Sequence, residues 1–370
     1  MNKQNQGPLV HIVKRGVMPW YYGWAIRAAA IVIALLVCGL ISSLVTGEDP
    51  VALYAAIIDG SFGSKRKIWI LLQNTAILLC VALALTPAFK MKFWNIGGEG
   101  QALAGALAAA ACMICLDTVM PNWAVICCMV VSSVLAGALW GAIPAIFKAR
   151  FNTNETLFTL MMNYVAMQIV AYYSVVWENP KGSGNIGVIN PKTMIGWFPN
   201  LGGSKYLLNI IIVAALTIGM FIYLKYSKQG YEISVVGESE RTARYIGIKV
   251  DKVIIRTMLI SGAICGVAGL LLVGGTNHTL NADIVGGRGF TAVMVAWLAK
   301  FNPLWMVLTS LLLVFLGRGA GEIATDFGLN PSYGDILTGL ILFFIIGSEF
   351  FINYKISFRK TAKKEVKKDV

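Results

Sequence analysis

Three stretches of this chain are each long enough to cross a lipid bilayer and carry almost no charge. Tyr206–Leu224 and Met258–Thr276 contain no charged residue, and Trp24–Val45 contains only Arg27. A helix of about 18 to 20 apolar residues spans the hydrocarbon layer and satisfies its own backbone hydrogen bonds. The alternation typical of transmembrane β-strands is not seen. We therefore expect an all-α, polytopic transmembrane helical bundle.

The composition agrees with a chain that faces lipid. Of the 370 residues, 57% are hydrophobic and 13% are charged, whereas soluble proteins carry about 25% charged residues. The net charge of +13 raises the question of nucleic acid binding. The basic residues lie between the apolar segments, however, which is typical of membrane topology and not of a nucleic-acid interface.

About ten segments have helical span length, and one of them is too short to cross alone. A short segment of this kind predicts a half-helix beside a re-entrant stretch, which only surrounding protein can bury. The expected spans are Trp24–Val45, Ile68–Phe89, Ile96–Leu116, Trp123–Phe147, Glu155–Trp177, Tyr206–Leu224, Met258–Thr276, Phe290–Ala299, Pro303–Gly321 and Ile336–Asn353.

Loop charges predict the orientation of the chain. Lysine and arginine gather in alternate loops, and the positive-inside rule then places both the N- and C-termini in the cytoplasm. The first apolar run follows a long tail and lacks a cleavage site, so we expect a retained anchor. The expected parts are a cytoplasmic tail over 1–23, a transmembrane domain over 24–354 with an extracellular loop at 178–205 and a cytoplasmic loop at 226–256, and a basic, lipid-facing cytoplasmic tail over 355–370.

No chemistry motif indicates an enzyme. The sequence has no phosphate-binding G-x-x-x-x-G-K-[ST] loop and no hydrolase or metalloprotease signature. His11 and His278 are isolated, and all seven cysteines lie in apolar runs. We expect those cysteines to be packing residues, with no metal site and no cofactor in this chain.

Polar residues inside the apolar segments are the informative exception. Amides and a carboxylate lie within spans at Gln73, Asn74, Asn163 and Gln168 and in the Gly-rich stretch Asn95–Gln101. A single amide there is more often an interhelical hydrogen bond, but the group together favours a polar pathway. Gly137 with Gly141 and Gly262 with Gly266 and Gly269 have the spacing of closely packed helices.

Four ordered motifs resemble the nucleoside-type permeases of ABC transporters, within the ribose and branched-chain amino-acid permease superfamily. Phe93–Gln101 resembles F-N-I-G-x-E-G-Q, and Asn154–Tyr164 resembles N-E-x-x-x-T-L-M-x-N-Y. Gly237–Ile248 is similar to the family's cytoplasmic G-x-N-x-x-A-A-x-x-x-G-I segment, and Gly287–Thr291 is similar to its G-x-G-F-D/T run. Thr291 stands where many relatives have Asp, which leaves the substrate less defined.

The resemblance implies a multi-pass protein of the bacterial plasma membrane that imports nucleosides. It implies a second, homologous permease subunit, an ABC ATPase that uses the ATP, and an extracellular substrate-binding lipoprotein. It also implies an ATPase-coupling helix that includes Glu238, Arg241, Ala243, Arg244 and Gly247.

The residues expected to line the substrate pathway combine hydrogen-bonding groups with one stacking ring. They are Asn74, Asn95, Glu99, Gln101, Asn163 and Phe290. Two alternatives stay open at this point. The same fold also imports sugars, riboflavin or autoinducer-like furanosides, and a secondary transporter would instead couple uptake to an ion. The second alternative is weaker, because ion coupling usually needs ionisable residues at mid-membrane, and Glu99, Asp117, Glu155 and Asp283 fall near span ends.

Overall fold

The structure, a computed structural model, describes residues 10–16, 19–47, 49–330 and 332–358. Within this part of the chain, nine helices are long and apolar enough to cross a membrane. A shorter apolar helix, α11 (Arg288–Leu298), is the tenth. The expectation of about ten spans, one of them short, is therefore confirmed.

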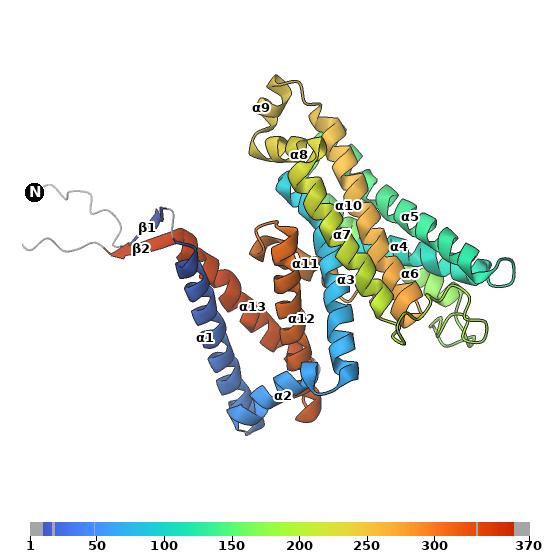
Figure 1. Cartoon of the computed structure of the whole chain (residues 1–370), viewed down its shortest axis with the longest axis horizontal. Helices are drawn as coiled ribbons and strands as arrows, with labels where there is room; N and C mark the ends of the chain where they lie inside the picture. The colour runs from blue at the N-terminus through green and yellow to red at the C-terminus, as the bar shows by residue number, and fades with distance from the viewer. Residues whose placement is uncertain (1–9, 17–18, 48, 331, 359–370) are drawn as a thin grey trace, which may run out of the picture. The chain divides into compact units, whose positions relative to one another are not determined.

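The chain divides into two compact units, residues 1–60 with 316–370 and residues 61–315. The second unit holds most of the helices (Figure 1). In chain order they are α3 (Lys65–Lys90), α4 (Gly98–Cys115), α5 (Asn122–Phe151), α6 (Glu155–Val176), α7 (Leu207–Tyr226), α8 (Lys228–Glu238), α9 (Glu240–Tyr245), α10 (Val250–Leu272) continued by the π-turn η1 (Val273–Asn277), α11, and the start of α12 (Pro303–Asp326).

Glycines bring the central helices of the second unit into close contact. α10 packs most extensively against α5 and also against α4 and α3. A Cβ atom on Gly262 would overlap the carbonyl oxygen of Gly137, and one on Gly266 would overlap that of Ser133. A Cβ on Gly269 would likewise meet the carbonyl oxygen of Ala102. Small residues allow such backbone approach between membrane helices, so the close packing expected from the glycine spacing is confirmed.

The first unit is built from both ends of the chain. It contains α1 (Trp20–Thr46), α13 (Ser332–Asn353), most of α2 (Pro50–Phe62) and the end of α12. Arg27 on α1 pairs with Glu349 on α13, and the Tyr333 hydroxyl lies 2.9 Å from Ser42 Oγ. An ion pair between two spans leaves neither charge alone in the hydrocarbon.

Two features of the fold differ from the sequence expectation. A two-stranded antiparallel sheet joins β1 (Val10–Lys14) to β2 (Tyr354–Phe358), where only tails were expected. The loop at 226–256 is mostly helical, because α8, α9 and the first turns of α10 lie within it. Charged residues in those turns hid the helix from a search for apolar runs. The basic stretch 359–370 lies outside the described residues.

Candidate functional site

Side-chain amides form hydrogen bonds within the break, the irregular backbone between α3 and α4. Asn95 Oδ1 accepts hydrogen bonds from the Gly97 amide at 3.0 Å and from Gln101 Nε2 at 3.1 Å. Asn95 Nδ2 donates to Ser261 Oγ on α10 at 3.1 Å. Asn95 and Gln101 are both buried. Buried amides need such partners, since an unpaired one costs about 1 to 3 kcal/mol.

Helix α6 completes the hydrogen bonding of this break. Asn163 Oδ1 accepts from the Gly100 amide at 2.8 Å, and Asn163 Nδ2 donates to the Ile96 carbonyl at 2.9 Å. Thr159 Oγ1 accepts from the Ile96 amide at 3.2 Å. One amide side chain therefore satisfies both a donor and an acceptor of the irregular backbone. Irregular backbone within a membrane protein requires such partners.

The carboxylate of Glu99 joins α4 to the short helix α11. Glu99 is 1% exposed and accepts from the Gly287 amide at 2.8 Å and from the Gly289 amide at 2.6 Å. These amides lie at the start of α11, where unpaired N–H groups attract an anion. Glu99 also lies in the first turn of α4. One negative charge thus stabilises the N-termini of two helices.

Arg288 continues this cluster toward a more exposed surface. Its Nη2 atom donates to Asn74 Oδ1 on α3 at 3.2 Å, and its Nη1 atom donates to the Val285 carbonyl at 2.9 Å. Asn74 is half-buried, and Phe290 is 41% exposed. The sequence motif included Arg288 without assigning it a role, and Ser261 gave no signal of its own.

The six residues expected along a pathway therefore gather around the start of α4 but fall into two groups. Asn95, Glu99, Gln101 and Asn163 are buried with their polar atoms engaged inside the protein. Asn74 and Phe290 are more accessible. Contact of any of them with substrate stays a prediction.

The segment expected to couple to an ATPase begins at the last residue of α8 and contains α9, at one end of α7 and α10 (Figure 1). Ser239 Oγ accepts from the Thr242 amide and caps α9, and Gly247 ends it at φ +86°, a value that favours glycine. Ala243 is buried in an apolar cluster with Met91, Ile233, Val250 and neighbouring side chains. It therefore anchors α9 to the rest of its own unit.

The outer side of α9 is exposed. Tyr245, the last residue of this polar helix, is 92% exposed, and Ile246, which follows it, is 52% exposed. Glu238, Arg241 and Arg244 are exposed as well, and Arg244 lies 3.4 Å from Asp251 in a surface ion pair. An exposed ion pair of this kind contributes little to stability, so breaking it costs little. The exposed side chains Glu238, Arg241 and Arg244 can therefore contact a partner protein.

The loop 178–205 is folded and not merely a connector. The Trp197 ring stacks on His278 at 3.8 Å between ring centroids, and Trp197 Nε1 donates to the Ile189 carbonyl at 2.9 Å. The Ile189 amide in turn donates to the His278 carbonyl at 2.7 Å. Burial, with a smaller effect of Lys205, lowers the pKa of His278 to about 4. In the described residues, no group of three His, Cys, Asp or Glu side chains could hold a metal ion.

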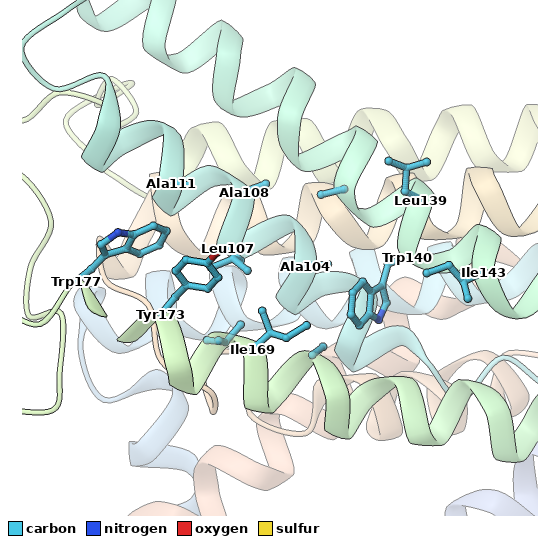
Figure 2. A pocket seen from close by; sticks show the side chains of 13 residues that line it. Ala104, Leu107, Ala108, Ala111, Leu139, Trp140, Ile143, Ile169, Tyr173 and Trp177 are labelled. Atoms are coloured by element: carbon cyan, nitrogen blue, oxygen red, sulfur yellow. The ribbon is translucent and has the colours of Figure 1, made fainter. Parts of the chain in front are cut away.

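An apolar groove of about 460 Å³ lies between α4, α5 and α6, as Figure 2 shows. Its lining is aliphatic and aromatic, with Trp140, Tyr173 and Trp177 as the residues that carry polar atoms. A solute rich in hydroxyl groups needs several hydrogen-bonding partners to leave water. The groove is therefore better suited to hydrocarbon than to a sugar or nucleoside.

Comparison with known proteins identifies the family. Residues 68–346 match the family described as "Branched-chain amino acid transport system / permease component". The chain belongs to this family. The permease is also 30% identical over 316 residues to the guanosine ABC transporter permease protein NupP of Bacillus subtilis. This match covers 85% of this chain and 90% of that protein.

Two further relatives of the permease differ in the solute that their names give. The nucleoside ABC transporter permease protein NupB of Lactococcus lactis is 28% identical, over 85% of this chain and 88% of that protein. The glucose ABC transporter permease protein TsgB13 of Haloferax volcanii is 26% identical, over 93% of this chain and 92% of that protein. The resemblance to nucleoside-type permeases is confirmed, and the chain is an ABC importer permease and a multi-pass protein of the plasma membrane.

Proposed function

We propose that this permease imports nucleosides. The observation that carries the proposal is the 30% identity to a guanosine permease over 85% of the chain, together with the nucleoside permease at 28%. The Asn95–Gln101 break and the Asn163 contact belong to two of the four motifs that resemble nucleoside-type permeases. They support the same reading, because they build one continuous hydrogen-bonded element.

The permease works in a complex with three other components. A second, homologous permease subunit pairs with it as a heterodimer, an ABC ATPase hydrolyses ATP, and an extracellular lipoprotein delivers the nucleoside. In this complex the ATPase, and not the permease, binds and uses the ATP. Closure of the ATPase moves the coupling helix and alternates access to the two sides of the membrane.

The ATPase docks on α9. Tyr245 and Ile246 offer apolar area that water does not favour, and Arg241 and Arg244 add charge beside it. Aromatic and arginine side chains dominate the binding energy of many interfaces. Ala243 and Gly247 serve the same contact indirectly, because they fix and end the helix that presents those side chains.

A sugar is the second candidate solute. The glucose permease of Haloferax volcanii matches 93% of the chain at 26% identity, and ribose is common to both solute classes. Riboflavin and autoinducer-like furanosides contain related polyol groups. An ion-coupled transporter has less support, because Glu99 is already bound to two backbone amides.

Competition for uptake distinguishes these candidates. Membrane vesicles that contain the permease, its partner permease and the ATPase are supplied with the binding lipoprotein and radiolabelled guanosine. Unlabelled nucleosides should compete at equal concentration, whereas glucose, ribose and riboflavin should not. No uptake of labelled guanosine, with uptake of labelled glucose by the same vesicles, would overturn the assignment in favour of a sugar.

A further inference from the structure

The exposed face of α6 is chemically unlike those of α5 and α7. Tyr164, Gln168 and Tyr172 follow one another at every fourth position and share one side of the helix. Tyr164 is 60% exposed and Tyr172 is 65% exposed, and Gln168 is exposed too. Together with Val165, Ile169 and Tyr173 they line a surface hollow. We call Tyr164, Gln168 and Tyr172 the Tyr–Gln–Tyr face.

Two other spans of the same unit, α5 and α7, show what a lipid-facing surface looks like in this protein. On α5 the same spacing places Val131, Leu135 and Leu139 on the exposed side. On α7 the exposed positions include Ile218 and Ile222. These faces are aliphatic, as contact with lipid tails requires. The Tyr–Gln–Tyr face breaks that pattern on a span of the same unit.

The depth of the face excludes a simple role at the membrane surface. Aromatic residues commonly gather at the two bilayer interfaces. Gln168 instead lies 13 residues after Glu155 in a helix of 22 residues, which is about 20 Å along an axis of roughly 33 Å. Tyr164 lies about 14 Å from the Glu155 end by the same rise per residue. Both side chains are therefore at hydrocarbon depth.

An amide at this depth needs a partner. Within the described residues, the Gln168 side chain has no intramolecular hydrogen bond. Polar side chains in membrane spans commonly face a water-filled cavity or bundle interior and mark substrate routes. In the complete transporter, the Tyr–Gln–Tyr face must therefore meet solute, water or another polar surface.

The opposite face of α6 holds the helix in place. Asn163 and Thr159 bond to the backbone of Ile96 and Gly100, so the position of α6 is tied to the break before α4. Two adjacent residues of α6 therefore have different roles. Asn163 points into the protein and fixes the helix, and Tyr164 points outward.

We propose that the Tyr–Gln–Tyr face lines the translocation pathway and contacts the nucleobase of the solute. The proposal rests on the nucleoside function proposed above. The tyrosine rings offer flat surfaces on which a base stacks, an interaction worth about 1 to 3 kcal/mol per base in other proteins. The Gln168 amide offers both a donor and an acceptor to the polar edge of the base.

Transport by substituted complexes tests this assignment. Proteoliposomes that contain the full complex receive binding protein loaded with guanosine or cytidine. The unchanged permease is compared with three variants: Gln168→Leu, Tyr164→Leu and Tyr164→Phe. Gln168→Leu and Tyr164→Leu should each lower guanosine transport by tenfold or more, with assembly unchanged in gel filtration. Gln168→Leu should also alter the guanosine-to-cytidine ratio, and Tyr164→Phe, which keeps the ring, should retain most transport. Leu135→Ala on α5 is the matched control and should transport normally.

The possible outcomes separate the two proposals. If the unchanged complex carries no nucleoside, the proposed function fails, and the base contact fails with it. If it carries nucleosides and Gln168→Leu matches it in rate and in solute preference, the function stands and the base contact is overturned. Loss of the partner permease from the Gln168→Leu and Tyr164→Leu complexes would instead make this face a subunit contact, which also overturns the proposal.

Discussion

The backbone amide of Gly289 donates a 2.6 Å hydrogen bond to the carboxylate of Glu99. The bond connects the first turn of α4 to the first turn of α11, helices that are far apart in the sequence. Both helices begin inside the protein, where water cannot satisfy their free N–H groups. A fixed negative charge at that point balances the positive ends of both helices.

Replacement of Glu99 by Gln should destabilise the permease. Gln keeps the shape of the side chain, but it loses the charge and turns an N–H group toward an N–H donor. Hydrogen bonds to charged groups contribute about 1.5 to 3 kcal/mol, so we expect a loss of that order. Thermal unfolding of the purified complex in detergent measures it. An unchanged midpoint would mean that Glu99 does not hold the two helix ends together.

Gly289→Ala should disrupt the same contact through sterics. A Cβ atom on Gly289 would overlap the backbone nitrogen of Glu99, and forced overpacking costs about 1 to 3 kcal/mol. Gly219→Ala is the matched control, because a Cβ there meets nothing within 4 Å and alanine favours the helix. Folded yield, measured by fluorescence-detected gel filtration, should fall for the first variant only. Equal yields would contradict the close approach.

Tyr245→Ser should weaken binding of the ATPase without unfolding the permease. The side chain is 92% exposed, so its loss removes no internal packing, whereas loss of a central interface aromatic often costs 2 kcal/mol or more (about 30-fold in affinity). Co-purification with the tagged ATPase provides the measurement. Lys92→Ser, an exposed change outside α9, serves as the control. Full recovery of the ATPase with Tyr245→Ser would place docking elsewhere.

Acid should loosen the loop 178–205. Burial holds the pKa of His278 near 4, below the ordinary value of about 6.5. The neutral ring therefore contributes its full stabilisation above about pH 6.5, and that contribution is lost as the pH falls toward 4. Hydrogen exchange in the loop should rise over this interval, because the ring stacks on Trp197.

His278→Phe separates this effect from general acid denaturation. Phenylalanine keeps a ring against Trp197 and cannot be protonated, so the pH dependence of exchange in the loop should flatten. Identical pH profiles in the two proteins would show that His278 does not control the loop.

The sequence predicted the spans well because their physical signal is strong. Uncharged runs such as Tyr206–Leu224 have few alternatives to a membrane helix, and α7 was found within two residues at each end. Signals of mixed character were harder to read. The start of α10 carries Asp251, Lys252 and Arg256, so an apolar-run search began that helix at Met258 instead of Val250.

The candidate site was predicted in its residues but not in its connections. The sequence motifs contain Asn95, Glu99 and Asn163, but the hydrogen-bond partners of these residues depend on tertiary structure. The Glu99–Gly289 bond joins positions 190 residues apart, and Ser261 is one serine among many. Gln168 was noted as an amide within a span, but the Tyr–Gln–Tyr face was not predicted, because a sequence does not show which side chains are exposed.

The dependence of transport on a separate ATPase tests the central claim most directly. Proteoliposomes with the complete complex, supplied with binding protein and labelled guanosine, are compared with vesicles that hold the permease subunits alone. Accumulation should require the ATPase and hydrolysable ATP, and it should stop when a non-hydrolysable analogue replaces ATP. Equal accumulation by vesicles that lack the ATPase would contradict the account.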